Sequence, residues 1–157
     1  MAAKNKIKFL VLDIDGVLTD GGMYYTENGD EFKKFNTKDG MGIKQALKKG
    51  IEIGFISSGK NENIINSRAK LLGVKYVYVG LGEKLDVLRK WCSVMKITYA
   101  DVAYIGDDIN DLLILSSVGF SACPLDAVDK VKKIAKIKLK MKGGEGCVRE
   151  FIDKYVL

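Results

Sequence analysis

Short apolar runs alternate with amphipathic stretches along most of the chain. Runs rich in Val, Ile, Tyr and Phe predict five β-strands, over residues 7–12, 51–56, 76–79, 102–105 and 118–122. The amphipathic stretches between them predict four helices, over residues 39–49, 61–72, 83–95 and 108–116. Strands that are apolar throughout and alternate with helices indicate a parallel sheet covered on both faces. The expected fold class is therefore α/β, a doubly wound parallel sheet. Since no linker or repeat interrupts the chain, we expect one domain over residues 1–157.

A segment after the first strand breaks this alternation. The run Glu-Asn-Gly-Asp at residues 27–30 predicts a β-hairpin over about residues 22–36, because Asn-Gly between strand-like residues favours a tight turn. Large apolar side chains occur on both faces of this hairpin: Met23, Tyr24, Tyr25, Phe32 and Phe35. An isolated hairpin is marginally stable in water, so it should pack on something else. We expect a neighbouring subunit, with folding onto its own domain as the alternative.

Lysines are concentrated in a second unusual segment, residues 130–142, where seven of thirteen residues are lysine. Nucleic-acid binding is one interpretation of such a run. Residues 136–142, however, alternate strictly between lysine and apolar residues, as an edge strand with one solvated face does. The whole chain has only three arginines, and no aromatic residues interrupt the run. An edge strand is therefore favoured, and no nucleic-acid partner is expected.

Composition removes several classes of chemistry. The chain has 26 basic and 20 acidic residues, a net charge of +6, and no histidine, so Ser-His and Cys-His couples and HExxH zinc sites are excluded. The three cysteines, Cys92, Cys123 and Cys147, form no CxxC pair and are expected to be reduced thiols. The basic segment Met1–Lys8 meets Asp13 before any long apolar region develops, so we expect neither a signal peptide nor a membrane span. The expected location is the cytoplasm.

Candidate chemistry follows the predicted strands, where ligands bind in open α/β sheets. Asp13 and Asp15 come after the first strand, and Gly-Asp-Asp-Ile-Asn-Asp comes after the fourth, at residues 106–111. Such a group of carboxylates suits Mg²⁺, a hard cation with oxygen ligands. Residues 57–60, Ser-Ser-Gly-Lys, offer hydroxyls and amides to an anion after the second strand, and Lys84 adds positive charge. Together these groups predict phosphoryl transfer through an aspartyl phosphate.

Four motifs carry a resemblance to a known family: DIDGVLTD at residues 13–20, FNTKDG at 35–40, GDDIND at 106–111 and GGEGCVRE at 143–150. With them the chain resembles the haloacid dehalogenase superfamily of Mg²⁺-dependent phosphatases. Within it, the chain is most similar to the 3-deoxy-D-manno-octulosonate 8-phosphate phosphatase group, whose members lack a cap domain and are tetrameric. The resemblance covers nearly the whole chain.

The resemblance implies a role for each motif. Asp13 would be the nucleophile, and Asp15 would protonate the leaving sugar alkoxide and then activate water. Mg²⁺ would be held by Asp13, Asp107 and the main-chain carbonyl of Asp15, while Lys84 would bind phosphate and pair with the nucleophile. The shell around the metal would contain Asp108, Asn110 and Asp111. Phosphate would also contact Ser57, Ser58 and Gly59. Substrate contacts would come from Asp15, Asn36, Thr37, Lys38, Asp39, Gly40, Lys44, Lys60 and Arg68.

Some alternatives stay open. Either Ser57 or Ser58 could supply the phosphate-binding hydroxyl, and Ser58 is favoured. Many relatives have Thr-Gly-Arg where this chain has Ser58-Gly59-Lys60, and a lysine lacks the two-pronged guanidinium that binds carboxylates. The resemblance implies the eight-carbon sugar acid phosphate as the substrate, and this departure leaves a nine-carbon acid 9-phosphate open as the alternative. A non-catalytic interaction protein is disfavoured because Asp13 and Asp15 are both present.

Quaternary structure is part of this hypothesis. The chain has no inserted domain that could cover the site, and a reactive phosphoaspartate needs protection from stray water. The resemblance and the two-faced apolar hairpin together predict a homotetramer in which the hairpin packs on a neighbouring subunit. The same resemblance implies that residues 143–149 reach that subunit's site. The lysine surplus suits a small anionic substrate.

Overall fold

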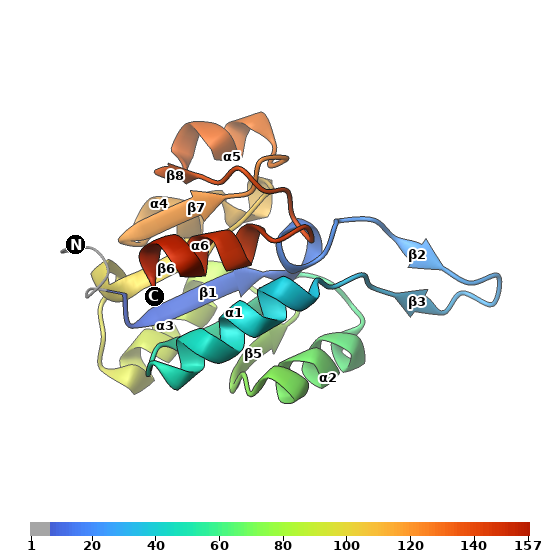
Figure 1. The fold of residues 1–157 in the computed structure, drawn as a ribbon, viewed down its shortest axis with the longest axis horizontal. Helices are drawn as coiled ribbons and strands as arrows, with labels where there is room; N and C mark the ends of the chain where they lie inside the picture. Colours follow the sequence, from blue (N-terminus) through green and yellow to red (C-terminus); the bar gives the residue numbers. More distant parts are fainter. Residues whose placement is uncertain (1–6) are drawn as a thin grey trace.

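Six parallel strands form the central sheet of the computed structural model, which describes residues 7–157 (Figure 1). In spatial order they are β5 (Tyr76–Val79), β4 (Glu52–Ser57), β1 (Phe9–Asp13), β6 (Val102–Ile105), β7 (Phe120–Cys123) and β8 (Ile137–Lys138). Because β1 pairs with both β4 and β6, the ends of these three strands lie side by side. The prediction that the chain has no signal peptide rests partly on residues 1–6, which lie outside the described residues.

Helices cover both faces of this sheet, as the doubly wound pattern predicts. One face carries α1 (Thr37–Lys48), α2 (Glu62–Leu72) and α6 (Cys147–Tyr155), and the other carries α3 (Lys84–Met95), α4 (Leu112–Ser117) and α5 (Asp129–Ile134). Alternate residues of β1 serve the two cores: Leu10 and Leu12 face one, while Phe9 and Val11 face the other. The predicted fold class is confirmed. None of the helices within residues 7–157 is long and apolar enough to cross a membrane.

Most predicted elements exist, but three differ from expectation. Residues 108–116 form a 3₁₀ turn at Ile109–Asp111 before α4 rather than one helix. Helices α5 and α6 were not predicted. The alternating lysine segment contributes only β8 at the sheet edge, not a strand over residues 136–142. The main-chain N–H groups of Lys140 and Met141 donate to the Glu150 carboxylate, at 2.9 and 3.0 Å, and so leave the sheet.

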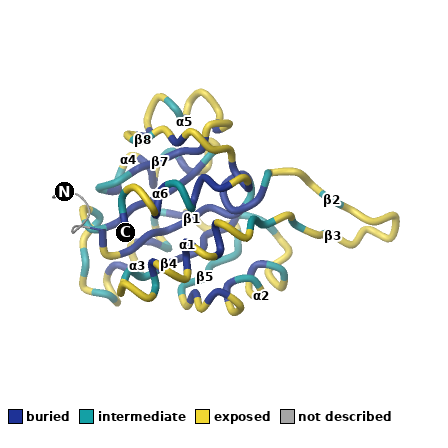
Figure 2. Tube along the Cα trace, in the orientation of Figure 1, coloured by how far each residue is buried: buried dark blue, intermediate teal, exposed yellow. Residues whose placement is uncertain are grey.

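The hairpin projects from the body of the molecule (Figures 1 and 2). Its strands are β2 (Tyr24–Tyr25) and β3 (Glu31–Phe32), and the rings of Tyr24 and Phe32 stack with centroids 5.2 Å apart. Met23 is 71% exposed, and Tyr25 and Phe32 are each 54% exposed. The domain that carries the hairpin therefore leaves these three apolar side chains uncovered, contrary to the alternative that they pack on it. The contact of the hairpin with a neighbouring subunit stays a prediction.

Residues 143–149 lie against their own chain. A Cβ atom on Gly143 would come within 1.8 Å of the main-chain oxygen of Gly16, and the Gly144 N–H donates to the Val17 carbonyl at 3.0 Å. Cys147 and Val148 begin α6 and are fully buried in the core. This corrects the expectation for the segment, because residues packed in their own core are not free to extend to a neighbouring subunit's site.

Candidate active site

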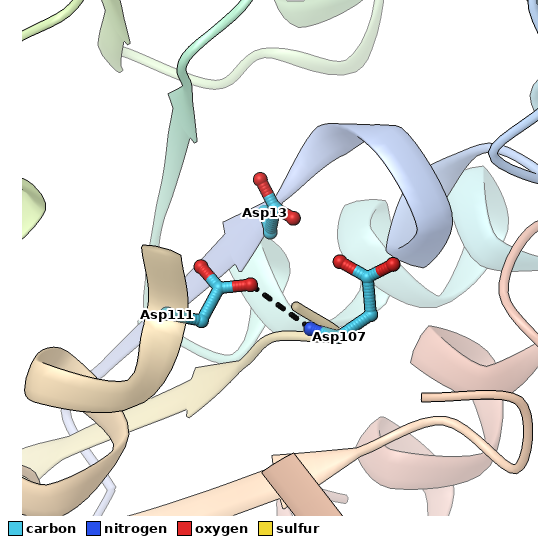
Figure 3. Close-up of side chains that lie close together, drawn as sticks. All are labelled: Asp13, Asp107 and Asp111. Atoms are coloured by element: carbon cyan, nitrogen blue, oxygen red, sulfur yellow. Dashed lines mark hydrogen bonds between the residues drawn. The ribbon is translucent and has the colours of Figure 1, made fainter. Parts of the chain in front are cut away.

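Three carboxylates meet where β1 and β6 end. Asp13 is the last residue of β1, Asp107 lies two residues beyond β6, and Asp111 closes the following 3₁₀ turn. Each offers an oxygen atom within 4.8 Å of the other two. Figure 3 shows the three carboxylates side by side, and its dashed line marks the hydrogen bond in which Asp111 Oδ2 accepts the Asp107 N–H at 2.9 Å.

Lys84, the first residue of α3, contacts two of these three carboxylates. Its Nζ lies 2.9 Å from Asp13 Oδ1 and 2.8 Å from Asp111 Oδ1, and the residue is only 2% exposed. Its predicted pairing with Asp13 is present. Tyr104, in the middle of β6, donates its hydroxyl hydrogen to Asp111 at 2.5 Å and lies 3.4 Å from Lys84 Nζ. Tyr104 was not predicted, although a tyrosine inside a buried strand needs a partner for its hydroxyl.

The cluster contains three carboxylates but only one cationic side chain, that of Lys84. Burial and the neighbouring Asp111 raise the pKa of Asp13, and burial raises the pKa of Asp107 to about 6. Burial alone would lower the pKa of Lys84, but the Asp13 and Asp111 carboxylates outweigh it and raise that pKa. Three carboxylates face a single ammonium, so a divalent cation would restore the charge balance.

The free donor atoms fit such a cation. Both oxygens of Asp111 are occupied: Oδ1 accepts from Lys84 and Tyr104, and Oδ2 accepts main-chain N–H groups. Asp107 Oδ1, by contrast, is buried and has no hydrogen-bond partner among residues 7–157. Because an unpaired buried oxygen is costly, a cation bound to Asp107 Oδ1 would stabilise it. Asp13 and Asp107 therefore have carboxylate oxygens available to a hard cation, whereas Asp111 holds Lys84 and the main chain of Asp107 in place.

The turn after β1 shapes this position. Within Ile14–Leu18, Gly16 has φ +87°, and a Cβ atom there would lie 1.9 Å from Asp107 Oδ2. Only glycine combines that backbone conformation with so close an approach. The Thr19 hydroxyl accepts the Gly16 N–H at 3.3 Å, which helps to hold the turn. The DIDGVLTD motif thus lets Asp107 approach the turn that follows Asp13 and Asp15.

A cavity of about 330 Å³ opens over the carboxylates. It is lined by Asp13, Asp15, Gly21, Ser58, Gly59, Asp107, Asp108 and Asn110. Ser58 Oγ faces this cavity and accepts from Asn110 Nδ2 at 3.3 Å, whereas Ser57 is 1% exposed and accepts the Gly59 N–H at 3.0 Å. This placement supports Ser58 over Ser57 as the phosphate-binding hydroxyl, a role that stays a prediction.

A second cavity of about 650 Å³ adjoins the first, between the hairpin and the loop after β4. The two cavities share Asp15, Gly21 and Gly59 in their walls. The predicted substrate contact Lys60 lines this second cavity, as do Glu31 and Lys33 of the hairpin. Lys33 was not predicted, and nothing in the local pattern separates it from Lys34. Its Nζ donates to Asp15 Oδ1 at 2.7 Å and to Glu31 Oε1 at 3.2 Å.

The other predicted substrate contacts line neither cavity: Asn36, Thr37, Lys38, Asp39, Gly40, Lys44 and Arg68. Three of them have structural partners instead. Asn36 caps α1 by accepting the Lys38 N–H at 2.8 Å. Buried Asp39 accepts the Arg149 N–H at 2.9 Å. The Arg68 guanidinium lies 5.3 Å from the centre of the Phe35 ring, close to Gly40.

Asp39 therefore faces the N-terminus of α6 rather than a substrate, and the expectation of direct substrate contact within its own subunit is corrected. The physical reason is that its helix packs against α6, whose first N–H groups need an acceptor. Thr37, Lys38 and Lys44 are exposed on α1, outside both cavities. The sequence of the FNTKDG motif does not reveal whether its polar side chains line a cavity or, like Asp39, connect two helices.

Comparison with known proteins agrees with this architecture. Residues 81–151 match the sequence family of haloacid dehalogenase-like hydrolases. The chain is 37% identical over 157 residues to the 3-deoxy-D-manno-octulosonate 8-phosphate phosphatase KdsC of Escherichia coli strain B, covering all of this chain and 83% of that protein. The enzyme of that name from Yersinia pestis superposes with a TM-score of 0.93 at 33% identity, over 97% of this chain and 82% of that one.

A second solved structure carries ligands. The 3-deoxy-D-manno-octulosonate 8-phosphate phosphatase of Moraxella catarrhalis, crystallised with magnesium, phosphate and KDO, superposes with a TM-score of 0.91 at 29% identity, over 97% of this chain and 87% of that one. Identity above 30% over the full chain, together with the carboxylate cluster, establishes the relationship. The chain belongs to the KdsC family of 3-deoxy-D-manno-octulosonate 8-phosphate phosphatases, within the haloacid dehalogenase-like hydrolases.

Proposed function

We propose that this protein hydrolyses the phosphate ester of 3-deoxy-D-manno-octulosonate 8-phosphate through an aspartyl phosphate on Asp13. The observation that carries the proposal is the contact of Lys84 with Asp13 at 2.9 Å, at the floor of a cavity that Asp15 also lines. The full-length similarity to KdsC phosphatases, and the KDO bound to the Moraxella catarrhalis relative, support the choice of substrate.

The first half-reaction transfers the phosphoryl group to the protein. An Asp13 carboxylate oxygen forms a bond to phosphorus while the bond from phosphorus to the sugar oxygen breaks. Asp15 lies in the cavity wall and gives its proton to the departing sugar oxygen. Lys84 holds the unreacting side of Asp13 and keeps the nucleophile oriented. The Ser58 hydroxyl, which also lines the cavity, would bind a phosphoryl oxygen. The Gly59 N–H would do so only by leaving Ser57 Oγ, to which it donates here.

The second half-reaction returns the protein to its starting state. Asp15, now ionised, accepts a proton from a water molecule that attacks phosphorus, and the bond between phosphorus and Asp13 breaks. Inorganic phosphate leaves with the Asp13 carboxylate restored. The residues that would hold Mg²⁺ are Asp13, Asp107 and the main-chain carbonyl of Asp15. When bound, Mg²⁺ would neutralise charge on the phosphoryl oxygens and on the carboxylate cluster.

Phosphate release from a panel of sugar-acid phosphates tests this proposal. The panel places the octulosonate 8-phosphate beside nonulosonate 9-phosphates and simple sugar phosphates, with Mg²⁺ or with EDTA. We expect turnover that prefers the eight-carbon acid, stops with EDTA and is abolished in Asp13→Asn. A nine-carbon preference would overturn the substrate and keep the mechanism, whereas EDTA-resistant turnover would overturn the role of the metal.

The assembly proposed with this function is a cytoplasmic homotetramer held by the hairpin. The exposed Met23, Tyr25 and Phe32 side chains support it, because an apolar hairpin that projects into water needs a cover. Light scattering behind a sizing column measures the assembly directly, and a monomer at micromolar concentration would contradict it.

A further inference from the structure

Lys33 is a buried cation on the exposed hairpin. Its side chain is only 7% exposed, although the adjacent Phe32 is 54% exposed and Lys34 is also exposed. The ammonium reaches back from the end of β3 to the body of the molecule, where it pairs with Asp15 at 2.7 Å and with Glu31 at 3.2 Å. A lysine side chain covered between two carboxylates differs from most lysine side chains, whose ammonium groups lie in solvent.

Asp15 depends on this contact for its orientation. Its side chain is 46% exposed, and Lys33 is its one side-chain partner within residues 7–157. Asp13, two residues earlier, is by contrast held by the buried Lys84. Without Lys33, the Asp15 carboxylate would be free to rotate toward solvent, since a half-exposed side chain with no partner samples several rotamers.

The same contact ties the hairpin across the mouth of the site. Glu31 accepts from Lys33 through one oxygen and from Asn61 Nδ2 through the other, and Asn61 immediately precedes α2. At the base of the hairpin, Thr19 and Phe35 form an isolated β-bridge. A continuous chain of polar contacts therefore runs from the loop after β4, through β3, to the acid–base carboxylate after β1.

We propose that Lys33 is a positioning residue that holds the Asp15 carboxylate for proton transfer and couples that step to the placement of the hairpin. The inference rests on the proposed acid–base role of Asp15. Lys33 acts through Asp15 and need not touch the substrate, because both of its carboxylate partners belong to the protein. Glu31 and Asn61 in turn hold Lys33 and the hairpin in place.

Leaving-group dependence separates this role from a structural one. A sugar alkoxide must be protonated as it leaves, whereas p-nitrophenolate leaves without a proton. In Lys33→Met we expect the single-turnover rate of leaving-group release to fall about 10- to 100-fold for the sugar-acid phosphate, with little change in KM, and less than about threefold for p-nitrophenyl phosphate. Hydrolysis of the aspartyl phosphate, in which Asp15 acts as the base, should slow equally with both substrates. Lys33→Arg keeps the cation and should recover most of the lost rate.

Two further variants sharpen the test. Lys34→Met removes the neighbouring exposed lysine and should leave both rates unchanged. In an Asp15→Asn background, Lys33→Met should cause almost no additional loss, because the residue through which it acts is already disabled. Equal losses in the rate of leaving-group release from both substrates, or a rise in KM alone, would overturn the inference. If the wild type prefers another sugar phosphate, the proposed substrate fails, and the Lys33 comparison is made with that sugar phosphate.

Discussion

Lys84 forms ion pairs with two carboxylates, those of Asp13, which precedes it in the sequence, and Asp111, which follows it. Its ammonium is within 2.9 Å of both, in a part of the molecule from which water is excluded. A buried ion pair that loses one partner leaves an uncompensated charge, which is more damaging than the absence of the whole pair. Lys84 therefore stabilises the fold as well as orienting the nucleophile.

Replacing this lysine should affect stability and turnover together. In Lys84→Met we expect the free energy of unfolding, measured by urea denaturation without metal, to fall by about 3–5 kcal/mol. Phosphatase turnover should fall by at least about 100-fold, since the nucleophile loses its orienting cation. Lys90→Met, on the exposed side of the same helix, is the matched control and should change neither. Unchanged stability of Lys84→Met would refute the structural role.

At the scale of single elements, the turn after β1 decides how closely Asp107 can approach the nucleophile. Gly16 and Gly50 have nearly equal backbone angles, φ +87° and +86°. A Cβ atom on Gly16 would lie 1.9 Å from Asp107 Oδ2, whereas one on Gly50 would meet no atom within 4 Å. The two positions therefore separate backbone strain from a steric clash.

Alanine at these two positions should give different outcomes. We expect Gly50→Ala to lower the free energy of unfolding by about 1–2 kcal/mol through strain alone, with turnover intact. Gly16→Ala adds displacement of Asp107, so it should lower stability further and reduce Mg²⁺-dependent turnover by at least about 100-fold. Thermal denaturation and phosphate release check both. Equal behaviour of the two variants would show that the approach of Asp107 is unimportant.

At the scale of the whole molecule, the two cores bury every cysteine of the chain. Burial raises the pKa of each thiol, to about 11 for Cys92, and Cys147 also donates to the Val17 carbonyl at 3.3 Å. A thiol reacts as its thiolate, so both inaccessibility and the raised pKa slow its reaction. Cys147 contacts the turn after β1 (Ile14–Leu18), so a reagent could modify its thiol only if the core opened there.

Thiol labelling therefore reports on the integrity of the fold. At pH 8 we expect all three cysteines of the native protein to resist a disulfide reagent over minutes, and all three to react after denaturation. The released chromophore gives the count directly. Rapid labelling of even one thiol in the native state would show that its element opens readily. Labelling should speed up as pH rises toward the pKa of Cys92, because the thiolate fraction increases.

The projecting hairpin gives a second prediction at this scale. Changing Met23, Tyr25 and Phe32 together to serine removes its exposed apolar surface without altering the two cores. If these side chains hold a tetramer, light scattering should show dissociation, while the far-UV circular dichroism of the subunit is unchanged. The matched control changes the exposed Leu71 and Val94 to serine, on the two helix layers away from the hairpin. Equal dissociation of the control would contradict the role of the hairpin.

The sequence by itself determined the sheet, the hairpin and the principal carboxylates. Apolar runs predicted β5 and β6 at their observed bounds. Strands of a sheet covered by helices on both faces leave a continuous hydrophobic pattern, and β6 is fully buried while β5 at the sheet edge is partly buried. Asp13, Asp15, Asp107 and Lys84 were found because parallel strands and the helix that follows each of them bring their ends to one edge of the sheet.

Only the tertiary structure decided which polar residues face the site. Asp39 and Asp15 both belong to polar motifs, yet one caps a helix and the other lines the cavity. Tyr104 contacts Asp111, 7 residues away in the sequence, and Lys33 contacts Asp15, 18 residues away. No local sequence pattern predicts either contact. The physical reason is that hydrogen bonds and ion pairs form wherever packing brings partners together, whereas hydrophobic periodicity is written along the chain itself.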